Sequence, residues 1–449
     1  MRMPSSARDF GVGSPEFGRN TLRSEFRAPC SARCAAIAAL LLVLSPSHAG
    51  AEEVLAGVAK AEFQLPAHVP LAGYSRRHGQ PSTGMHDPVG VRALVLQDGA
   101  TTAALVSADL LIIDEVLVRA VRKQLIRAGW PKDGAVLLAA THTHSGPGAY
   151  GKRLLEKVSM GHFNPDVFAQ IASAIVQTIL SARAAVEPAR VVWTSATVPE
   201  FVLNRLGRGG DTDPELIAVG WYRSQAEAPF AVLMTYSAHP TLLGANNMQR
   251  SAEYPGAAMR EVERLIPGAT GLFFAGAVAD QGPVKSGEPY ERIEVVGREL
   301  ARRAVEALEG RKAETPGSVS AMEQQMPLPK ARVRIGKRSL PRWLSARLVD
   351  DDATLSLLRV GTLLFIGAPC DLAAPLGQQL KQAARAQQQQ PVLIGFANDY
   401  IGYCIPEEWY RSNEYEAGMA FNGPKTGGLI VERLIEMIHA LVASPGHET

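Results

Sequence analysis

The chain has 449 residues, of which 46% are hydrophobic and 20% are charged, with a formal net charge of +2. This composition is that of an ordinary globular protein, and the length suffices for one large domain or two smaller ones. Six arginines and three acids lie in the first 51 residues, so the remainder is close to neutral. A near-neutral chain gives no reason to expect a nucleic-acid partner or a broad membrane-binding face.

The first 51 residues differ from the rest of the chain. Arginines at positions 19, 23, 27 and 33 precede the ten-residue apolar run 35–44, and Ala49-Gly-Ala51 offers a small-residue cleavage site. An apolar core of that length is too short to span a bilayer and is typical of a secretory signal peptide. We therefore predict that residues 1–51 are removed on export to the periplasm or the medium, that no stable membrane span remains, and that residues 52–449 form a single domain.

Strands and helices begin to alternate directly after the leader. The predicted elements are a short strand within 54–71, a hairpin of strands 91–96 and 102–109 joined at Asp98-Gly99, and a helix over 114–128 that stops at Gly129-Trp-Pro131. Tyr74 and Arg76 lie in the polar loop before this hairpin. They are candidates to line a cleft, although a loop arginine is more often solvated surface.

The run Val136-Leu-Leu-Ala-Ala140 predicts a buried strand and leads into Thr-His-Thr-His-Ser-Gly-Pro-Gly148. Side chains alternate along a strand, which would place His142 and His144 on the same side, roughly 7 Å apart. A pair of polar caps is the alternative interpretation. Two buried imidazoles would need two separate partners, whereas one shared metal site would serve both.

The alternation continues to the end of the chain. Predicted helices are 165–185, 255–265, 290–308, 375–385 and 426–442; predicted strands are 190–198, 215–222, 229–236, 271–280, two within 353–367, and 391–396; the stretch 314–343 is read as edge strands and loops. This pattern predicts an α/β fold of mixed β-sheets layered with helices. Sites in such folds gather at the carboxyl ends of strands, where we place the metal site.

Metal-type side chains follow four of the predicted strands: His142 with His144, His239, Asp371 and Tyr400. Catalytic zinc sites typically use three His or carboxylate ligands and leave one position open, and a Tyr oxygen can add a weaker ligand. Taken singly, His239 can cap a strand, Asp371 can cap a helix and Tyr400 can be a core aromatic. No local motif joins them, so their convergence is an expectation about the tertiary structure.

Cys370 and Cys404 are the cysteines that remain after the predicted signal peptide. An even number of cysteines in an export compartment permits a disulfide. A Cys370–Cys404 bridge would pin the part of the site that holds Asp371. Two free buried thiols are the equal alternative.

A set of short motifs spans nearly all of the chain after the leader: Ala72-Gly-Tyr74, His86-Asp-Pro88, Thr141 to Gly148, Asn204-Arg205, Ala238-His-Pro-Thr241, Gly276 to Asp280, Gly367 to Asp371, Asn398 to Tyr403, Glu407-Glu408 and Tyr415-Glu416. In this order they resemble the neutral/alkaline, non-lysosomal ceramidase family, a group of zinc-dependent amidases. The resemblance implies that His142, His239 and Tyr400 are zinc ligands, and that His144 and Arg205 contact the substrate. Asp371 stands where the family has a ligating Glu, and Asp can also bind zinc.

Two departures from the family pattern bear on the substrate. Ala279-Asp-Gln-Gly-Pro283 stands where the ceramidases read Gly-Asp-Val-Ser-Pro, so Gly282 replaces a serine implicated in catalysis. The ceramidases also carry an immunoglobulin-like domain after the catalytic domain, whereas this sequence ends soon after its last predicted helix. We therefore expect residues 52–449 to correspond to the catalytic domain.

The resemblance implies a zinc-dependent hydrolase that cleaves the amide bond of an N-acyl lipid such as ceramide. Zn²⁺ would acidify a water molecule and polarise the carbonyl, His144 would transfer the proton, and Arg205 and Tyr400 would stabilise the oxyanion. The candidates for substrate binding are Tyr74, Arg76, Tyr403 and Tyr410. The alternatives are a zinc hydrolase of a different amide or ester, and a secreted binding protein that kept the fold without turnover.

Overall fold

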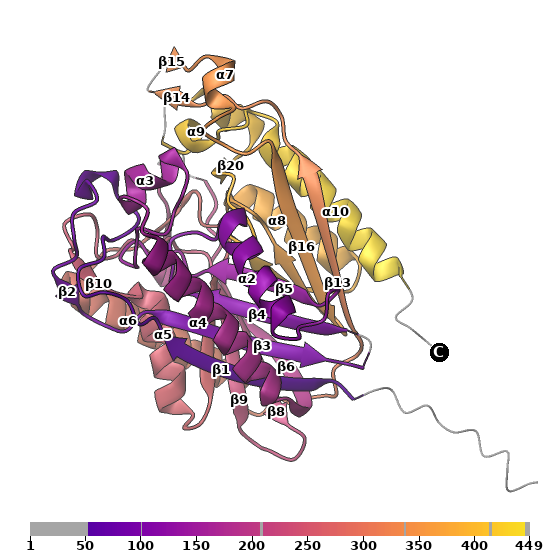
Figure 1. The fold of residues 1–449 in the computed structure, drawn as a ribbon. Coiled ribbons are helices and arrows are strands. Elements are labelled where there is room, and N and C mark those ends of the chain that lie inside the picture. Colours follow the sequence, from indigo (N-terminus) through magenta and orange to yellow (C-terminus); the bar gives the residue numbers. More distant parts are fainter. Residues whose placement is uncertain (1–52, 100, 207–209, 336–337, 413–414, 445–449) are drawn as a thin grey trace, which may run out of the picture. The chain divides into compact units, whose positions relative to one another are not determined.

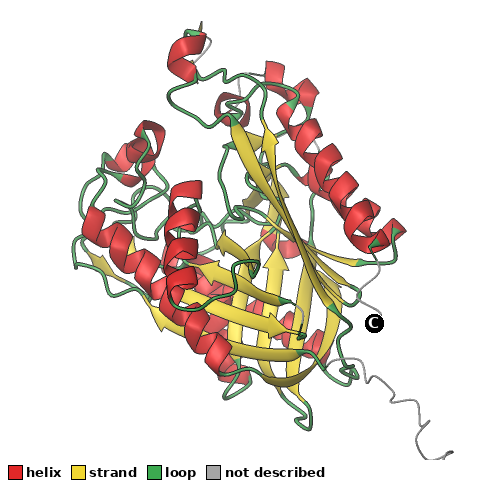
Figure 2. Cartoon of the chain, turned by 45° about the vertical axis from the view of Figure 1, so that its right-hand side comes forward, coloured by secondary structure: helices red, strands yellow, loops and turns green. Residues whose placement is uncertain are grey.

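Eight strands form one large mixed sheet in the order β11-β9-β8-β6-β1-β3-β4-β5 (Figures 1 and 2). The computed structural model describes residues 53–99, 101–206, 210–335, 338–412 and 415–444, so the predicted signal peptide lies outside the described residues. The strands are β1 (Leu55–Glu62), β3 (Gly90–Gln97), β4 (Thr102–Ala108), β5 (Ala135–Ala140), β6 (Glu187–Thr197), β8 (Glu215–Arg223), β9 (Pro229–Tyr236) and β11 (Thr270–Ala275). The pairs β4–β5 and β9–β11 are parallel, and β3–β4 form the predicted antiparallel hairpin.

A second sheet of four strands packs against the first. Its order is β13-β16-β17-β19, from β13 (Val319–Pro327), β16 (Asp352–Val360), β17 (Leu363–Gly367) and β19 (Gln390–Ile394). Leu94 and Leu137 of the large sheet share a buried cluster with Leu358 and Phe365 of the small one. Because both faces of β17 are covered, its sequence is almost continuously apolar.

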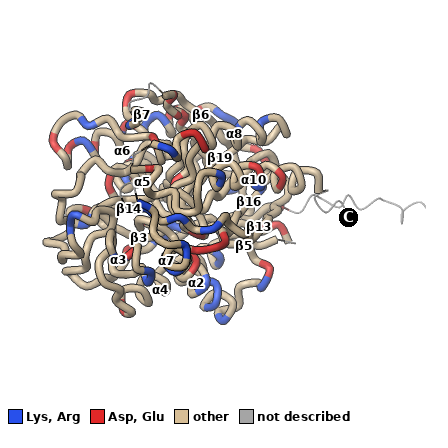
Figure 3. Tube along the Cα trace, turned by 90° about the horizontal axis from the view of Figure 1, so that it is seen from above, with Lys and Arg blue, Asp and Glu red and all other residues tan. Residues whose placement is uncertain are grey.

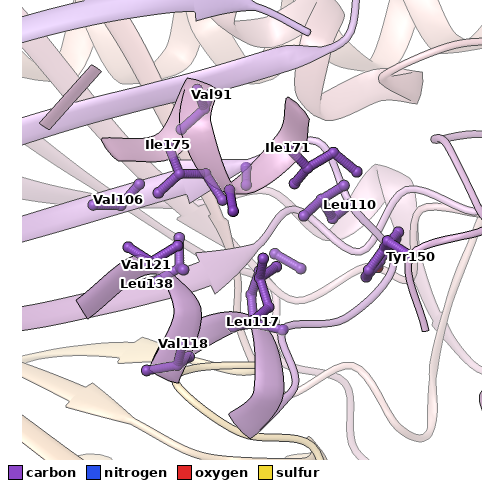
Figure 4. Packing of buried hydrophobic residues seen from close by; sticks show 14 of the residues in the cluster. Val91, Val106, Leu110, Leu117, Val118, Val121, Leu138, Tyr150, Ile171 and Ile175 are labelled. Carbon is purple, nitrogen blue, oxygen red and sulfur yellow. The ribbon is translucent and has the colours of Figure 1, made fainter. Parts of the chain in front are cut away.

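Helices cover the outer faces of both sheets. Helices α2 (Glu115–Arg127) and α4 (Pro165–Ala184) pack on the β1-β3-β4-β5 part, α5 (Glu253–Leu265) and α6 (Pro289–Leu308) on the β8-β9-β11 part, and α8 (Ala374–Ala386) and α10 (Thr426–Ala443) on the small sheet. Figure 4 shows the first of these cores, where Ile171 and Ile175 of α4 and Val121 of α2 lie over the strand residues Val106 and Leu138.

The helix boundaries follow from local chemistry. Helix α2 begins after Asp114, whose carboxylate accepts a hydrogen bond from the main-chain amide of Leu117. Helix α4 begins after Asn164 and has a proline at its first position. Among the described residues, α4 is the one helix long and apolar enough to cross a membrane. Eight of its residues are buried against the rest of the fold.

Shorter elements gather at one end of the described chain, the top of Figure 1. They are α3 (Leu154–Met160), α7 (Arg342–Ser345), α9 (Tyr415–Met419), β14 (Arg334–Ile335) and β15 (Arg338–Ser339). Three other two-stranded pairs complete the fold: β2 (Gly84–Met85) with β10 (Gln249–Arg250), β7 (Val202–Asn204) with β12 (Gln281–Pro283), and β18 (Asp371–Leu372) with β20 (Tyr403–Cys404).

The predicted α/β fold of mixed sheets layered with helices is confirmed. One predicted strand is too long, because the run 271–280 leaves the sheet after Ala275 and turns into β12. The described part of 314–343 contains an edge strand, β13, and the small hairpin of β14 and β15, as expected. The candidate ligands follow the carboxyl ends of β5, β9, β17 and β19, which the tertiary structure brings toward one another.

Candidate metal centre

His142 and His144, which follow the apolar run Val136–Ala140, do not lie on a strand. Strand β5 ends at Ala140, and His142 adopts a left-handed backbone with a φ of 63°. The predicted separation of roughly 7 Å assumed that strand geometry continued, and this assumption is wrong. The turn instead brings the Nε2 atoms of His142 and His144 to 3.2 Å of each other.

A third histidine completes the cluster. His239 follows β9, and its Nε2 lies 2.9 Å from Nε2 of His142 and 2.9 Å from Nε2 of His144. The three side chains offer one nitrogen each to a common centre and could hold a metal ion. The sequence interpretation placed His144 beside the metal, whereas the structure places its Nε2 as close to the centre as the other two.

Main-chain carbonyls orient two of these imidazoles. Nδ1 of His142 lies 2.6 Å from the carbonyl oxygen of Leu111, and Nδ1 of His239 lies 3.3 Å from that of Val278. A carbonyl only accepts, so each Nδ1 carries the proton and each Nε2 keeps its lone pair. Phe396 stacks on His142 at 3.8 Å between ring centroids and further limits its rotation.

Burial keeps this cluster free of positive charge. It lowers the pKa of His142 to about 3 and holds the pKa values of His144 and His239 well below the ordinary value, with further lowering by Arg205. Neutral imidazoles with lone pairs facing a common point repel one another unless a cation lies between them. The residues therefore fit a divalent transition-metal ion, the kind that imidazole nitrogens bind.

Asp371 adds a carboxylate to the centre. It is fully buried, its Oδ2 lies 3.8 Å from Nε2 of His142, and neither carboxylate oxygen has a hydrogen-bond partner of good geometry. Burial raises the pKa of Asp371 to about 7, against the opposing effect of Arg205. A buried carboxylate without partners is costly, and a metal ion would offset that cost.

Arg205 and Tyr403 lie near Asp371. Tyr403 is the register partner of Asp371 in the β18–β20 pair, and its hydroxyl accepts a hydrogen bond from Nη2 of Arg205 at 3.2 Å. Arg205 also pairs with Glu416 at 3.0 Å. Burial lowers the pKa of Arg205, but Tyr403, Asp371 and Glu416 outweigh it, so the guanidinium stays charged beside the centre.

Tyr400 and Tyr410 have different surroundings. Tyr400 lines the pocket described below and stacks on Phe396 at 6.0 Å, and burial beside Asp371 raises its pKa. Tyr410 packs under the guanidinium of Arg334 and does not line that pocket. The structure thus places Tyr400 at the centre's pocket and Tyr403 in contact with Arg205, while Tyr410 packs under Arg334 of β14.

The two cysteines are free thiols in this structure, both buried, so the predicted bridge is not formed. Cys370 directly precedes Asp371 of β18, and Cys404 follows Tyr403 within β20. Burial raises the pKa of the Cys370 thiol, and its hydrogen bond with Cys404 raises it further. Two free buried thiols are the alternative that the sequence left open.

The Ala72-Gly-Tyr74 loop packs on His144. The ring of Tyr74 lies 4.9 Å from that of His144, and a Cβ on Gly73, which has a φ of +109°, would lie 2.7 Å from Nδ1. Arg76 is exposed and has no described contact there. Its neighbour Arg77 is buried and donates to the carbonyl of His144 at 2.6 Å.

An open pocket leads to the centre. Its lining is largely apolar and includes His142, His144, Leu111, Ile112, Leu155, Leu348, Val349, Tyr400, Ile401, Tyr403, Tyr415, Met419 and Phe421. The ion pair between Arg153 and Asp350, 2.6 Å long, joins its two sides. The centre is thus reached through a pocket that suits an apolar group.

Known proteins share this sequence pattern and fold. The family model described as neutral/alkaline non-lysosomal ceramidase, N-terminal, matches residues 55–272. The neutral ceramidase of Pseudomonas aeruginosa is 23% identical over 90% of this chain and 75% of its own length, and that of Mycobacterium tuberculosis is 22% identical over 83% and 74%. The crystal structure of the Pseudomonas aeruginosa neutral ceramidase superposes with a TM-score of 0.79 over 88% of this chain and 76% of that one, at 21% identity.

By sequence and by fold, the chain is a relative of the neutral/alkaline ceramidases. In this ceramidase relative Gly282 lies in β12 opposite Leu203 of β7, next to Arg205. A Cβ there would lie 3.3 Å from Cβ of Arg205, so the position faces the arginine of the centre.

Several residues of the centre in this ceramidase relative were not identified from the sequence. Phe396 and Arg77 act through packing and main-chain contacts, for which the sequence carries no local signal, whereas Gly73 lies in the Ala72-Gly-Tyr74 motif and only its close approach to His144 shows what it does. Glu416 lies in a motif shared with the family, and only its ion pair with Arg205 indicates what it does.

Proposed function

We propose that the chain is a zinc-dependent amidohydrolase that cleaves the amide bond of an N-acyl lipid, with ceramide as the first candidate. The observation that carries this proposal is the cluster of three histidines and Asp371 at the end of a largely apolar pocket. The relatives named neutral ceramidase support the choice of substrate. His142, His239 and Asp371 would hold the ion, with His144 or Tyr400 completing the set.

Zn²⁺ bound at this centre would supply Lewis acidity, which polarises a carbonyl oxygen and makes water more acidic. Within the chain, His144 is the candidate to move the proton. In His142 and His239, a hydrogen bond from Nδ1 to a main-chain carbonyl fixes the tautomer. Nδ1 of His144 has no such hydrogen bond of ordinary geometry. An imidazole without a fixed tautomer can take a proton from water and return it to the leaving amine.

The guanidinium of Arg205 would stabilise the negative charge that develops on the amide oxygen. It is already charged, only partly exposed and held by Glu416 and Tyr403, so it needs no reorganisation during the reaction. Loss of a preorganised donor of this kind typically lowers kcat by about 100- to 1,000-fold.

Gly282 favours direct attack by water over a covalent intermediate on this residue. It faces Arg205 but carries no hydroxyl, so it cannot form an acyl-enzyme. The substrate carbonyl would lie between Arg205 and the histidine cluster. The alternatives that the same residues support are hydrolysis of another amide or ester, and binding without turnover.

The test is hydrolysis of a short-chain fluorescent ceramide by the purified protein, before and after chelation, with simple N-acyl amides and esters in parallel. We expect cleavage that chelation abolishes and zinc restores. His142→Ala should lose both zinc and activity. Cleavage of other amides or esters, but not of ceramide, would show that the substrate is a different amide or ester. A protein that retains zinc but cleaves none of these compounds would favour the alternative of binding without turnover.

We also propose that the protein is exported and that residues 1–51 are removed. The support is the arginine-flanked apolar run 35–44 and the Ala49-Gly-Ala51 site. The mass and the first residue of the protein recovered from the periplasm or the medium would test this. A cytoplasmic protein that keeps its leader would contradict it.

A further inference from the structure

A strongly basic segment lies at the end of the molecule that carries α3, α7 and α9. We call residues 330–347 the basic segment. It contains no Asp or Glu, and its exposed cations are Lys330, Arg332, Arg338, Arg342 and Arg347. None of these five forms an ion pair with a described residue. Figure 3, which looks down on this end, shows stretches of Lys and Arg around α7.

Exposed apolar side chains accompany these charges. Trp343 of α7 is 65% exposed, Leu154 and Val158 of α3 are 62% and 56% exposed, and Tyr415 of α9 is 62% exposed. The guanidinium of Arg347 lies 5.6 Å from the Trp343 ring. A soluble surface rarely exposes large apolar residues together in this way, and Trp beside Arg and Lys is typical of side chains at a membrane interface.

The same elements surround the entrance of the pocket. Leu348 and Val349, which directly follow the basic segment, line the pocket, and so does Leu155, which follows the exposed Leu154. Among the described residues, the exposed acids near the basic segment are fewer than its five exposed cations. Asp350 is paired with Arg153, and the exposed ones near the segment are Asp351, Glu407 and Glu408. The surface around the entrance therefore combines a positive excess with apolar side chains.

We propose that this end of the protein docks on an anionic lipid surface, with the basic segment contacting headgroups and Trp343, Leu154 and Val158 entering the interfacial layer. Docking in this orientation places the pocket entrance against the bilayer, so that a lipid amide can enter without crossing water. The near-neutral net charge of the whole chain conceals this local excess. The role in substrate entry rests on the proposed function, whereas the binding itself does not.

The experiment is flotation of the full protein with vesicles of phosphatidylcholine, with and without phosphatidylserine, at low and high salt. We expect binding that requires phosphatidylserine and weakens with salt. The triple variant R338Q/R342Q/R347Q should bind on the order of 100-fold more weakly, since each surface cation contributes to lipid attraction. W343A should bind about tenfold more weakly.

The matched control is R302Q/R311Q/K312Q, which removes three cations from α6 and the residues that follow it, and it should bind like the unchanged protein. Equal binding by both triple variants would overturn the proposal, as would equal binding to both kinds of vesicle. Salt-sensitive retention of the protein by RNA or an acidic protein, without vesicle binding, would assign the surface to that partner instead.

Two substrates separate this proposal from the proposed function. The basic-segment variants should cleave soluble short-chain ceramide like the unchanged protein but lose at least tenfold on ceramide embedded in anionic vesicles. If no ceramide is cleaved while the vesicle binding persists, the proposed function fails and the docking stands. If cleavage persists while the variants bind vesicles normally, the docking fails alone.

Discussion

At the residue scale, two buried carboxylates near the centre, Asp371 and Asp280, differ in their hydrogen bonding. Neither oxygen of Asp371 has a hydrogen-bond partner of good geometry, whereas Asp280 accepts hydrogen bonds from the amide of Ala374 and from the side chains of Asn204 and Gln281. Both are fully buried. A buried charge is tolerated when it is paired, so the first carboxylate awaits a ligand and the second stabilises the fold.

This contrast predicts opposite effects of one substitution. Asp371→Asn should raise the melting temperature of the metal-free protein, because burial disfavours the charged carboxylate more than Arg205 favours it, and should shrink the rise on adding zinc. Asp280→Asn should lower the melting temperature with or without zinc, because it should reduce the free energy of unfolding by about 1–3 kcal/mol. Thermal melts with and without zinc measure both. A zinc-induced rise that survives Asp371→Asn would remove this residue from the metal set.

Arg77 supports the centre without a place in it. Its guanidinium donates to the carbonyls of Ala72, His144, Gly244 and Ala245 and ties three loops together. Burial lowers the pKa of Arg77 to about 10, which still leaves it charged at neutral pH.

We therefore expect Arg77→Met to destabilise the protein by about 3 kcal/mol, since it leaves several buried carbonyls without a donor, and to lower activity. Arg76→Met, next to it but exposed, should change neither. Urea denaturation and the short-chain ceramide assay measure the two effects. Similar behaviour of the two variants would show that the carbonyl contacts do not hold the loops.

At the element scale, helix α5 begins with a strained, buried acid. Glu253 has a φ of 54°, is fully buried, and accepts from the amides of Leu242 and Leu243 in the loop after His239. Burial raises its pKa from 4.5 to about 7. The folded protein therefore binds a proton that the unfolded chain releases between these two values.

This shift has a defined sign in stability. The contribution of Glu253 is fully present below pH 4.5 and is lost as the pH rises through about 7, a loss of about 3 kcal/mol. Glu253→Gln cannot titrate, so its stability relative to the unchanged protein should improve between about pH 4.5 and pH 7. Urea denaturation across this range tests it. Glu261→Gln on the same helix, whose pKa is lowered by Arg264, is the control and should not show this improvement.

At the scale of the whole molecule, the candidate ligands join both sheets. His142 and His239 follow strands of the large sheet, and Asp371 follows β17 of the small sheet. An ion held by all three would bind the folded state and not the unfolded chain. Such binding stabilises by about 2.7 kcal/mol when the free metal is at 100 times its dissociation constant.

Zinc should therefore shift the unfolding of both sheets together. We expect calorimetry to show one transition that chelation moves to lower temperature and zinc restores. His239→Ala should abolish this response, while His86→Ala, which stacks on Tyr290 away from the cluster, should keep it. A response limited to part of the transition would indicate that the ion contacts one sheet only.

Much of this protein follows from local patterns in the chain. Apolar runs and caps such as Asp114 define the strands and helices, because burial and backbone hydrogen bonding act over a few residues. Polar side chains just past strand ends, such as His142, His239 and Asp371, mark where a site forms, because strand ends meet at a common edge. These signals suffice for the α/β fold and for the neighbourhood of the centre.

Other features depend on contacts between distant segments. Sequence cannot distinguish Arg76 from Arg77, since only packing turns one to solvent and the other to four carbonyls. The left-handed turn at His142 and the stacked Phe396 bring three imidazoles within 3.2 Å, which strand alternation does not predict. Tertiary structure decides these features because they arise from main-chain direction and close packing, and neither is encoded by residue spacing alone.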